Sequence, residues 1–230
     1  MKSIKQEMNL SDSDNQIIIT LDGSHTVYSS LFKEHYHSLD GALNESQYIF
    51  IDLGLKTINS TEIFIFELGF GTGLNAMLTE KYARENKIKI HYHSIELYPI
   101  HLKIQNELNH KATAELDFVM YKKIMGCTWN QEVEINDHFV LRKINSDFTF
   151  WEFDQFYHLI YFDAFSPETQ PELWSGQIFK KVWNCLLPLG ILMTYSSKGI
   201  VKEALRNAGF FVKRLPGPGR KRHILRAIKQ

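Results

Sequence analysis

The 230-residue sequence has few of the features that place a protein outside the cell or in a membrane. Its two cysteines, Cys127 and Cys185, are far apart and form no metal-binding spacing. Isolated cysteines of this kind are typical of reduced thiols rather than of a disulfide framework. No apolar run reaches the roughly 18 residues of a membrane helix, and the N-terminus lacks a signal-peptide core. We therefore expect a cytoplasmic protein that does not associate with membranes.

Metal-ligand clusters, repeats and low-complexity tracts are also missing. The histidine pairs His35/His37 and His91/His93 alternate along the chain, but no third ligand accompanies either pair. We expect packed or surface histidines there, and no metal. Hydrophobic content of 44% and charged content of 23% are ordinary for a globular protein.

The length suits one α/β domain with a small appendage. A strand over residues 16–21, with a returning partner after Gly23, predicts a small N-terminal β element. We expect residues 1–60 to form a β and helical extension, and residues 61–230 to form the main domain.

The formal net charge of zero conceals an asymmetry along the chain. From Lys198 to the end there are ten Lys or Arg against one acid, whereas the rest of the chain holds sixteen Lys or Arg and twenty-five acids. A basic segment on an acidic protein indicates a phosphate-rich partner such as a nucleic acid. The alternative is an ordinary solvated surface.

An apolar run over residues 63–66 is followed by Glu67 and by the alternate glycines Gly69, Gly71 and Gly73. Bulky residues closed by glycine predict a buried strand and a tight turn that brings backbone close to a ligand. Leu74 stands where the dinucleotide fingerprint needs its third glycine. The observed spacing resembles that of class I S-adenosylmethionine (SAM) methyltransferases, and a glycine turn without a ligand is the alternative.

Three further acids follow predicted strands. Glu96 ends the strand pattern of residues 87–95, where a carboxylate can accept both hydroxyls of an adenosine ribose. Asp147 follows the second arm of a predicted hairpin over residues 129–144; it is a candidate adenine ligand, with a turn or helix cap as the alternative. Asp163 ends the apolar run that starts at His158, at the sheet edge where open α/β folds bind ligands.

Strands and helices alternate along the main domain. We expect helices after the glycine turn and over residues 172–187, and a closing antiparallel pair formed by residues 210–212 and 223–228. This order predicts a Rossmann-like α/β fold of the class I SAM methyltransferase type. Its sheet would be mostly parallel and seven-stranded, with an antiparallel C-terminal edge.

Several motifs taken together resemble one family. They are Tyr36-His37-Ser38 with Gly41-Ala42-Leu43-x-Glu45-Ser46, Phe66 to Asn75 around the glycines, Phe162 to Pro167 with Pro171-Glu172-Leu173-Trp174, and Gly219-Arg220-Lys221-Arg222. The chain is similar, from about Tyr28 onward, to the methyltransferase part of the bacterial bifunctional enzyme that completes 5-methylaminomethyl-2-thiouridine in tRNA. The bifunctional form also carries an FAD-dependent oxidase. Because this sequence stops at Gln230, we expect a stand-alone methyltransferase without FAD.

The resemblance implies methyl transfer from SAM to the aminomethyl nitrogen of 5-aminomethyl-2-thiouridine at the wobble position. It aligns the family's catalytic aspartate with Asp163, which we expect to hold the amine and help remove its proton. A helix cap is the alternative for Asp163.

The remaining site residues are assigned by their expected contacts. Phe165 and Pro167 would wall the pocket of the extruded base, although Phe165 also suits a core position. The expected SAM contacts are Glu67, Gly69, Gly71 and Gly73 at the methionine and ribose end, Glu96 at the ribose, Asp147 at the adenine, and Tyr36 and Glu45 as closing residues. Arg220, Lys221 and Arg222 would contact tRNA phosphates.

Two other functions fit parts of the pattern. An aminopropyltransferase of the spermidine-synthase type shares the fold and the strand-end acids, but its catalytic loop normally has a second aspartate before a proline. Here the loop reads Asp163-Ala164-Phe165-Ser166-Pro167. A non-catalytic SAM-binding or RNA-binding module is the second alternative, and the retained acids Glu67, Glu96 and Asp163 argue against it.

Overall fold

The fold is seen in a computed structural model that describes residues 15–113, 115 and 118–230. Its central feature is a large sheet, whose strands occupy four long apolar segments and two hairpins. In chain order the strands are β4 (Glu62–Leu68), β5 (Lys89–Glu96), β6 (Glu132–Asn136), β7 (Phe139–Asn145), β8 (Tyr157–Phe162), β9 (Leu186–Thr194), β10 (Phe210–Pro216) and β11 (His223–Lys229).

The strand order is β10-β11-β9-β8-β4-β5-β7-β6. The five strands from β9 to β7 pair in parallel, whereas β6, β10 and β11 pair antiparallel with their neighbours. This arrangement confirms the predicted fold class. The sheet has eight strands rather than seven because the predicted hairpin around Asn136 and Asp137 adds β6 to the edge beside β7.

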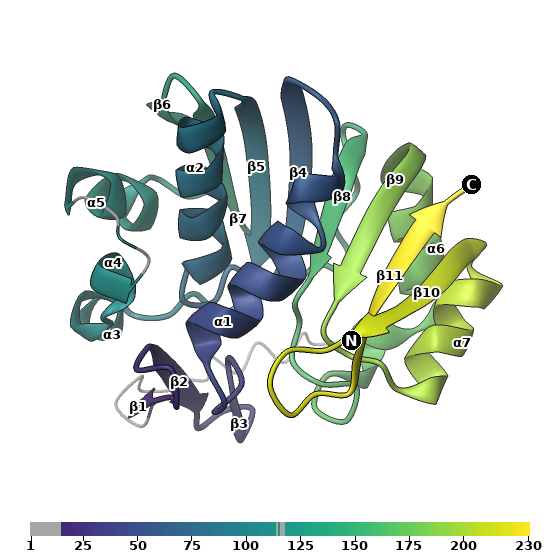
Figure 1. Cartoon of the computed structure of the whole chain (residues 1–230), viewed down its shortest axis with the longest axis horizontal. Helices are drawn as coiled ribbons and strands as arrows, with labels where there is room; N and C mark the ends of the chain where they lie inside the picture. Colours follow the sequence, from purple (N-terminus) through teal and green to yellow (C-terminus); the bar gives the residue numbers. More distant parts are fainter. Residues whose placement is uncertain (1–14, 114, 116–117) are drawn as a thin grey trace, which may run out of the picture.

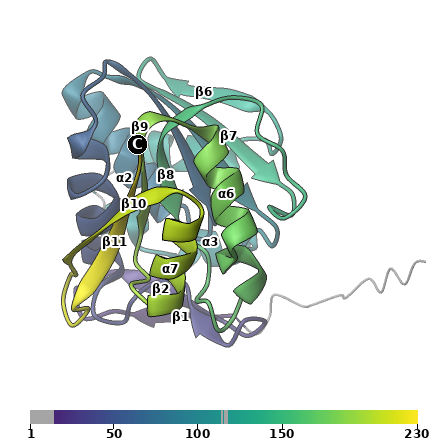
Figure 2. The ribbon, with the colours of Figure 1, turned by 90° about the vertical axis from the view of Figure 1, so that its right-hand side faces the viewer.

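Helices cover both faces of the sheet. The main helices are α2 (Leu74–Asn86), α3 (Leu102–Glu107), α4 (His110–Thr113), α5 (Phe118–Gly126), α6 (Gly176–Cys185) and α7 (Gly199–Asn207). Figure 2 shows α2 on one side of the sheet and α6 and α7 on the other. Side chains of β4 alternate between these layers: Ile63 and Ile65 pack under α2, whereas Phe66 and Leu68 pack under α6. A strand buried on both faces explains the continuous apolar run.

The helix expected over residues 172–187 is shorter than predicted. The segment forms a 3-10 turn, η4 (Pro171–Trp174), and then α6, which Ser175 caps by accepting a hydrogen bond from the Ile178 amide. The chain is extended from Leu186 onward, and Gly190 lies inside β9 next to an irregularity in the β8–β9 pairing.

The small N-terminal sheet lies at the carboxyl ends of the parallel strands, and the helical segment that follows it packs beside α2 (Figure 1). A three-stranded sheet of β1 (Gln16–Ile19), β2 (His25–Ser29) and β3 (Glu34–His35) is followed by α1 (Ala42–Ser46), the π-helix η2 (Gln47–Asp52) and the 3-10 turn η3 (Leu55–Thr57). Figure 1 shows this small sheet below the ends of β4, β5 and β8. Ile49 and Phe50 of η2 belong to the same core as β4, so the division at residue 60 remains a prediction.

Two histidine rings, that of the half-buried His37 after β3 and that of the fully buried His110 in α4, meet where the small sheet packs against the helices. The rings of His37 and His110 lie 6.1 Å apart, edge to face, and the His37 Nδ1 is 3.3 Å from the Thr26 hydroxyl. Burial lowers the pKa of His37 to about 4, against the opposing charges of Glu45 and Asp22, and it lowers the pKa of His110 to about 3, against the opposing charge of Asp22. Both rings are therefore neutral in the folded protein above about pH 4.

This burial predicts a fold that weakens in mild acid. Between about pH 6.5 and 4 the unfolded chain takes up protons at these imidazoles while the folded protein does not, so the free energy of unfolding falls as the pH falls. We expect His110→Phe to reduce that fall by on the order of 2 kcal/mol. Urea denaturation at several pH values measures it. His223→Phe, at an exposed position, is the matched control; equal slopes in both variants would contradict the prediction.

Candidate functional site

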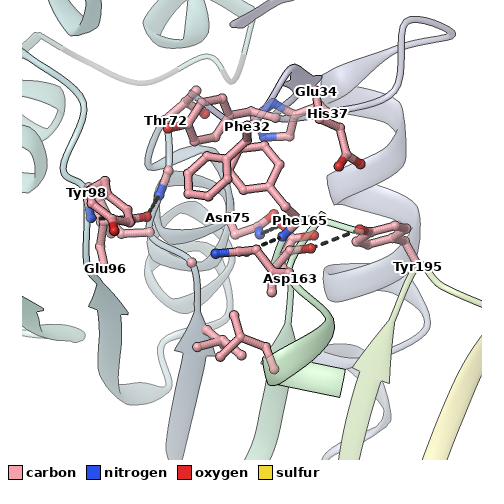
Figure 3. A pocket seen from close by; sticks show the side chains of 18 of the residues that line it. Phe32, Glu34, His37, Thr72, Asn75, Glu96, Tyr98, Asp163, Phe165 and Tyr195 are labelled. Carbon is pink, nitrogen blue, oxygen red and sulfur yellow. Dashed lines mark hydrogen bonds between the residues drawn. The ribbon is translucent and has the colours of Figure 1, made fainter. Parts of the chain in front are cut away.

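A cavity of about 690 Å³ opens at the carboxyl ends of the parallel strands. It lies where the chain leaves β4 and its neighbours β5 and β8 in different directions, which is the usual ligand position in open α/β sheets. The side chains that line it include Glu96, Asp147, Asp163 and Tyr195 from the strand ends, and Phe32, Tyr36 and Glu45 from the N-terminal elements. Figure 3 shows several of these side chains converging from opposite sides.

The turn after β4 needs its glycines for two close approaches. Gly69 has φ +94°, and a Cβ there would lie 2.8 Å from the Asp163 carbonyl oxygen. Gly71 has φ +50°, and a Cβ there would lie 3.0 Å from the Tyr36 ring. Both line the cavity. Gly73 begins α2 with φ 75° and packs against Met125 instead, so the structure does not bring it into the cavity.

Thr72 supplies an observation that tests whether SAM fits here. Its side chain is 1% exposed and lines the cavity, and its hydroxyl has no hydrogen-bond partner among the described residues. A buried hydroxyl at the N-terminus of a helix is suited to the carboxylate of an amino-acid ligand. The residues present therefore fit the methionine end of SAM.

Glu96 lies at the end of β5, as predicted, and faces the cavity. Its carboxylate accepts hydrogen bonds from the amides of Gly71 (3.1 Å) and Tyr98 (2.9 Å), and burial raises its pKa. One bond ties it to the glycine turn, so the two predicted ligand-binding elements form a single unit.

Asp147 also lines the cavity, two residues beyond the end of β7. Its carboxylate accepts hydrogen bonds from the amide (2.8 Å) and the hydroxyl (2.7 Å) of Thr149. Asp147 therefore caps a turn, which is the alternative role that the sequence allowed for it. The adenine contact remains a prediction.

Glu67 is one layer beneath the cavity and does not line it. It is 1% exposed and accepts hydrogen bonds from the Asn75 side-chain amide (3.0 Å) and the Ser94 hydroxyl (2.6 Å). Burial raises its pKa to about 8. The same Asn75 nitrogen donates to Asp163 at 2.8 Å (Figure 3). Glu67 is thus placed to orient Asn75, and through it Asp163, rather than to touch SAM directly.

Asp163 lines the cavity, and the pKa of its carboxyl group is raised. Burial, assisted by the negative charge of Glu45, raises its pKa to about 7, whereas the Asn75 hydrogen bond and the charge of Lys221 act in the opposite direction. A carboxylate with a pKa near neutrality can accept a proton and release it again at physiological pH.

Aromatic rings from distant parts of the chain cover the cavity next to Asp163. Phe165 stacks on Phe32 with centroids 4.4 Å apart, and Tyr36 meets Phe165 edge to face at 4.8 Å. Glu34 fixes this contact by accepting hydrogen bonds from the amide (3.3 Å) and the hydroxyl (2.9 Å) of Ser166. Pro167 does not line the cavity.

The three cations predicted to contact phosphate occupy different environments. Arg220 and Arg222 are exposed and lie outside the cavity, and Arg220 has its Nε 3.5 Å from an Asp40 oxygen. Lys221 instead lines the cavity and forms an ion pair with Glu45.

The electrostatic character of the cavity is acidic. Six carboxyl side chains line it, and Lys221 is the single Lys or Arg among the described lining residues. Such a wall favours cationic ligands. In the part of the chain that the structure describes, no three His, Cys, Asp or Glu side chains form a metal-binding group. No described helix is long and apolar enough to span a membrane.

Sequence reasoning missed several lining residues, namely Phe32, Glu34, Thr72, Asn75 and Tyr195. Tyr195 follows β9 directly, so the strand-end argument that found Asp163 applies to it equally. Asn75 is the second residue of α2, and its side chain reaches Asp163 beyond β8. Phe32 and Glu34 carry no local signal, because their place depends on how the small sheet docks.

A family model described as an S-adenosyl-L-methionine-dependent methyltransferase matches residues 110–230. The tRNA 5-methylaminomethyl-2-thiouridine biosynthesis bifunctional protein MnmC of Legionella pneumophila (strain Lens) is 29% identical over 245 residues, covering 86% of this chain and 34% of that protein. The protein of the same name from Aeromonas salmonicida (strain A449) is 29% identical over 220 residues, covering 85% and 33%. This chain thus spans about a third of the length of these curated relatives.

Solved structures give the same picture. MnmC2 from Aquifex aeolicus is 25% identical, with a TM-score of 0.75 over 94% of this chain and 70% of that one. Spermidine synthase from Thermotoga maritima is 12% identical, with a TM-score of 0.59 over 94% and 69%, and this likeness concerns the fold alone. The family resemblance inferred from the motifs is confirmed.

Asn75 offers a direct test of how the site sets the proton affinity of Asp163. Asn75→Leu removes a hydrogen bond that favours the carboxylate, so the pKa of Asp163 is expected to rise above about 7. Carboxyl ¹³C NMR titration measures it. Asn86→Leu, near the far end of α2, should leave the value unchanged. An unchanged or lower pKa in Asn75→Leu would show that this hydrogen bond does not control Asp163.

Proposed function

This chain belongs to the S-adenosyl-L-methionine-dependent methyltransferase family, and from that premise we propose that it methylates the aminomethyl nitrogen of 5-aminomethyl-2-thiouridine in tRNA. The observation that carries the proposal is the acidic cavity around Asp163. A sulfonium and an alkylammonium are both cations, and an acidic wall can hold the two side by side. The named activity of the similar MnmC proteins supports the tRNA substrate.

The cosubstrate site is assigned to the edge formed by the glycine turn and β5. When bound, SAM supplies a methyl group on a positively charged sulfur. The unpartnered Thr72 hydroxyl and the backbone at Gly69 and Gly71 would hold its methionine end, and Glu96 its ribose. Asp147 remains the proposed adenine contact.

Asp163 is proposed to act as the general base. An alkylammonium has no free electron pair, so the substrate must lose one N–H proton before it can react. The Asp163 carboxylate takes that proton, and the nitrogen lone pair then forms the new N–C bond while the S–C electrons return to sulfur. A pKa of about 7 lets the resulting acid give its proton to solvent afterwards. Asn75 and Glu67 keep the carboxylate in place.

The aromatic cover and the exposed cations are assigned to the nucleic acid. A modified uracil must leave its stack to reach Asp163, and Phe165, with Phe32 and Tyr36 beside it, offers flat surfaces against which it can pack. Arg220 and Arg222 lie on the loop between β10 and β11, next to the cavity residue Lys221, where they can contact backbone phosphates.

The direct test is mass spectrometry of tRNA nucleosides after incubation with SAM. The substrate is tRNA that carries aminomethyl-thiouridine, and the expected product is the methylaminomethyl nucleoside. Putrescine with decarboxylated SAM tests the aminopropyltransferase alternative in parallel. Formation of an aminopropyl product without any methylated nucleoside would replace the proposed function with that alternative. If neither product forms, the protein would be a non-catalytic binding module.

Replacing the proposed base should stop catalysis without preventing SAM binding. Asp163→Asn keeps the size of the side chain and its contact with Asn75 but cannot take up the proton. We expect a fall in kcat of about 10²–10⁴-fold, with the affinity for SAM changed by only a few fold. Single-turnover kinetics and calorimetry measure the two quantities. Asp137→Asn, in the β6–β7 turn, is the control, and normal turnover in Asp163→Asn would remove this residue from the mechanism.

The exposed cations predict a salt-sensitive affinity for tRNA. Arg220→Glu combined with Arg222→Glu should raise KM for tRNA and flatten its dependence on salt, because fewer counterions are released on binding. Methylation rates at several salt concentrations measure both effects. Lys87→Glu, at the end of α2 farthest from the cavity, is a single charge reversal that serves as the control. Equal behaviour of the two proteins would assign Arg220 and Arg222 to ordinary surface.

A further inference from the structure

Lys221 is the one member of the cationic loop whose side chain enters the cavity. The loop between β10 and β11 is closed by hydrogen bonds from the Gly217 amide to the Arg222 carbonyl (3.2 Å) and from the Lys221 amide to the Pro218 carbonyl (3.0 Å). A Cβ at Gly217 would lie 2.3 Å from the Lys221 carbonyl oxygen, so the turn requires glycine there. This shape directs Lys221 inward while Arg220 and Arg222 remain exposed.

The Lys221 ammonium rests in a subsite made of a carboxylate and an aromatic face. One Glu45 oxygen pairs with it, while the other accepts a hydrogen bond from the Ser38 amide at 2.8 Å. The ammonium nitrogen also lies 4.5 Å from the centre of the Tyr195 ring. A carboxylate together with an aromatic face is a general recognition site for organic ammonium ions.

This subsite adjoins the proposed base. The Tyr195 hydroxyl donates a hydrogen bond to the Ala164 carbonyl at 2.9 Å, which fixes its ring beside the residue that follows Asp163 (Figure 3). The charges of Glu45 and Lys221 both act on Asp163. An ammonium held at this place is therefore next to the carboxylate that would deprotonate it.

We propose that Lys221 occupies, in the free protein, the subsite formed by Glu45 and Tyr195 that receives the ammonium of the substrate's aminomethyl group, and that it leaves when the substrate binds. This inference rests on the proposed function. Lysine and an aminomethyl group both present a primary ammonium on a methylene carbon, so exchanging one for the other conserves the charge of the cavity. An uncharged substituent could not replace Lys221, so the exchange selects for an amine.

The exchange also connects the cavity with the nucleic acid. When Lys221 leaves Glu45 it needs another counter-charge, and it lies between Arg220 and Arg222, which face solvent. Backbone phosphates that contact these arginines would be within reach of the released ammonium. A free amine brings no phosphate and must displace Lys221 unaided, so the lysine also disfavours small amines.

Titration with propylammonium chloride tests the subsite without using tRNA. Propylammonium can bind only to the fraction of the protein in which Lys221 has left the subsite, so its apparent affinity is the intrinsic affinity multiplied by that fraction. Lys221→Met is therefore expected to bind propylammonium about tenfold more tightly than the unmodified protein. Adding Glu45→Gln should abolish this gain. Ligand-observed NMR measures the affinities, with 1-propanol as the uncharged control ligand and Arg220→Met as the control variant. Circular dichroism confirms that each variant is folded.

Equal propylammonium affinity in Lys221→Met and unmodified protein would overturn the inference, as would a gain that survives Glu45→Gln. Methylation kinetics give an independent comparison, because the opened subsite offsets the lost phosphate contact in Lys221→Met, so KM for tRNA should rise less in Lys221→Met than in Arg222→Met. A rise of similar size in both would make Lys221 an ordinary phosphate ligand. Absence of any tRNA methylation would reject the proposed function, while the propylammonium titration would still decide whether the ammonium subsite exists.

Discussion

The side-chain amide of Asn75 bridges two buried carboxyl groups, and the arrangement of the site depends on this bridge. Its nitrogen donates to Glu67 on β4 and to Asp163 beyond β8, two adjacent parallel strands of the sheet. Two acids in such surroundings have a strong tendency to be protonated, because burial disfavours the charged form. Sharing one amide donor keeps the Asp163 carboxyl group oriented toward the cavity, and the pKa of that group stays near 7. The glycine turn, α2 and the loop after β8 all meet at this point.

The sequence predicted the parts of the site that follow from local rules. Strand-end acids and alternate glycines could be located because a buried strand is recognisable from its apolar run, and its carboxyl end is where ligands bind. Glu96 and Asp163 line the cavity for that reason. The fold class followed from the alternation of strands and helices, and the extra strand β6 came from a hairpin that the sequence already indicated.

What the sequence could not provide was the direction of individual side chains and the docking of distant segments. Glu67 lies within a strand rather than beyond it, so the alternation of the strand turns it toward Asn75 and Ser94 instead of the cavity. Lys221 looked equivalent to Arg220 and Arg222, because nothing in three consecutive cations shows which one a tight turn directs inward. The long predicted helix failed at Leu186, where sheet pairing with β8 outweighed a helical pattern.

The side chains that cover the cavity come from segments that lie far apart in the sequence. Phe32 and Glu34 precede the first strand of the large sheet and contact Phe165 and Ser166, and Glu45 meets Lys221, which stands 176 positions later in the chain. Contacts between such distant residues form late in folding, because the loops that they close are long. During synthesis the sheet can therefore pair strand by strand while its binding edge stays open. The ion pair between Glu45 and Lys221 cannot form until residue 221 has left the ribosome, so a shorter nascent chain has no closed site.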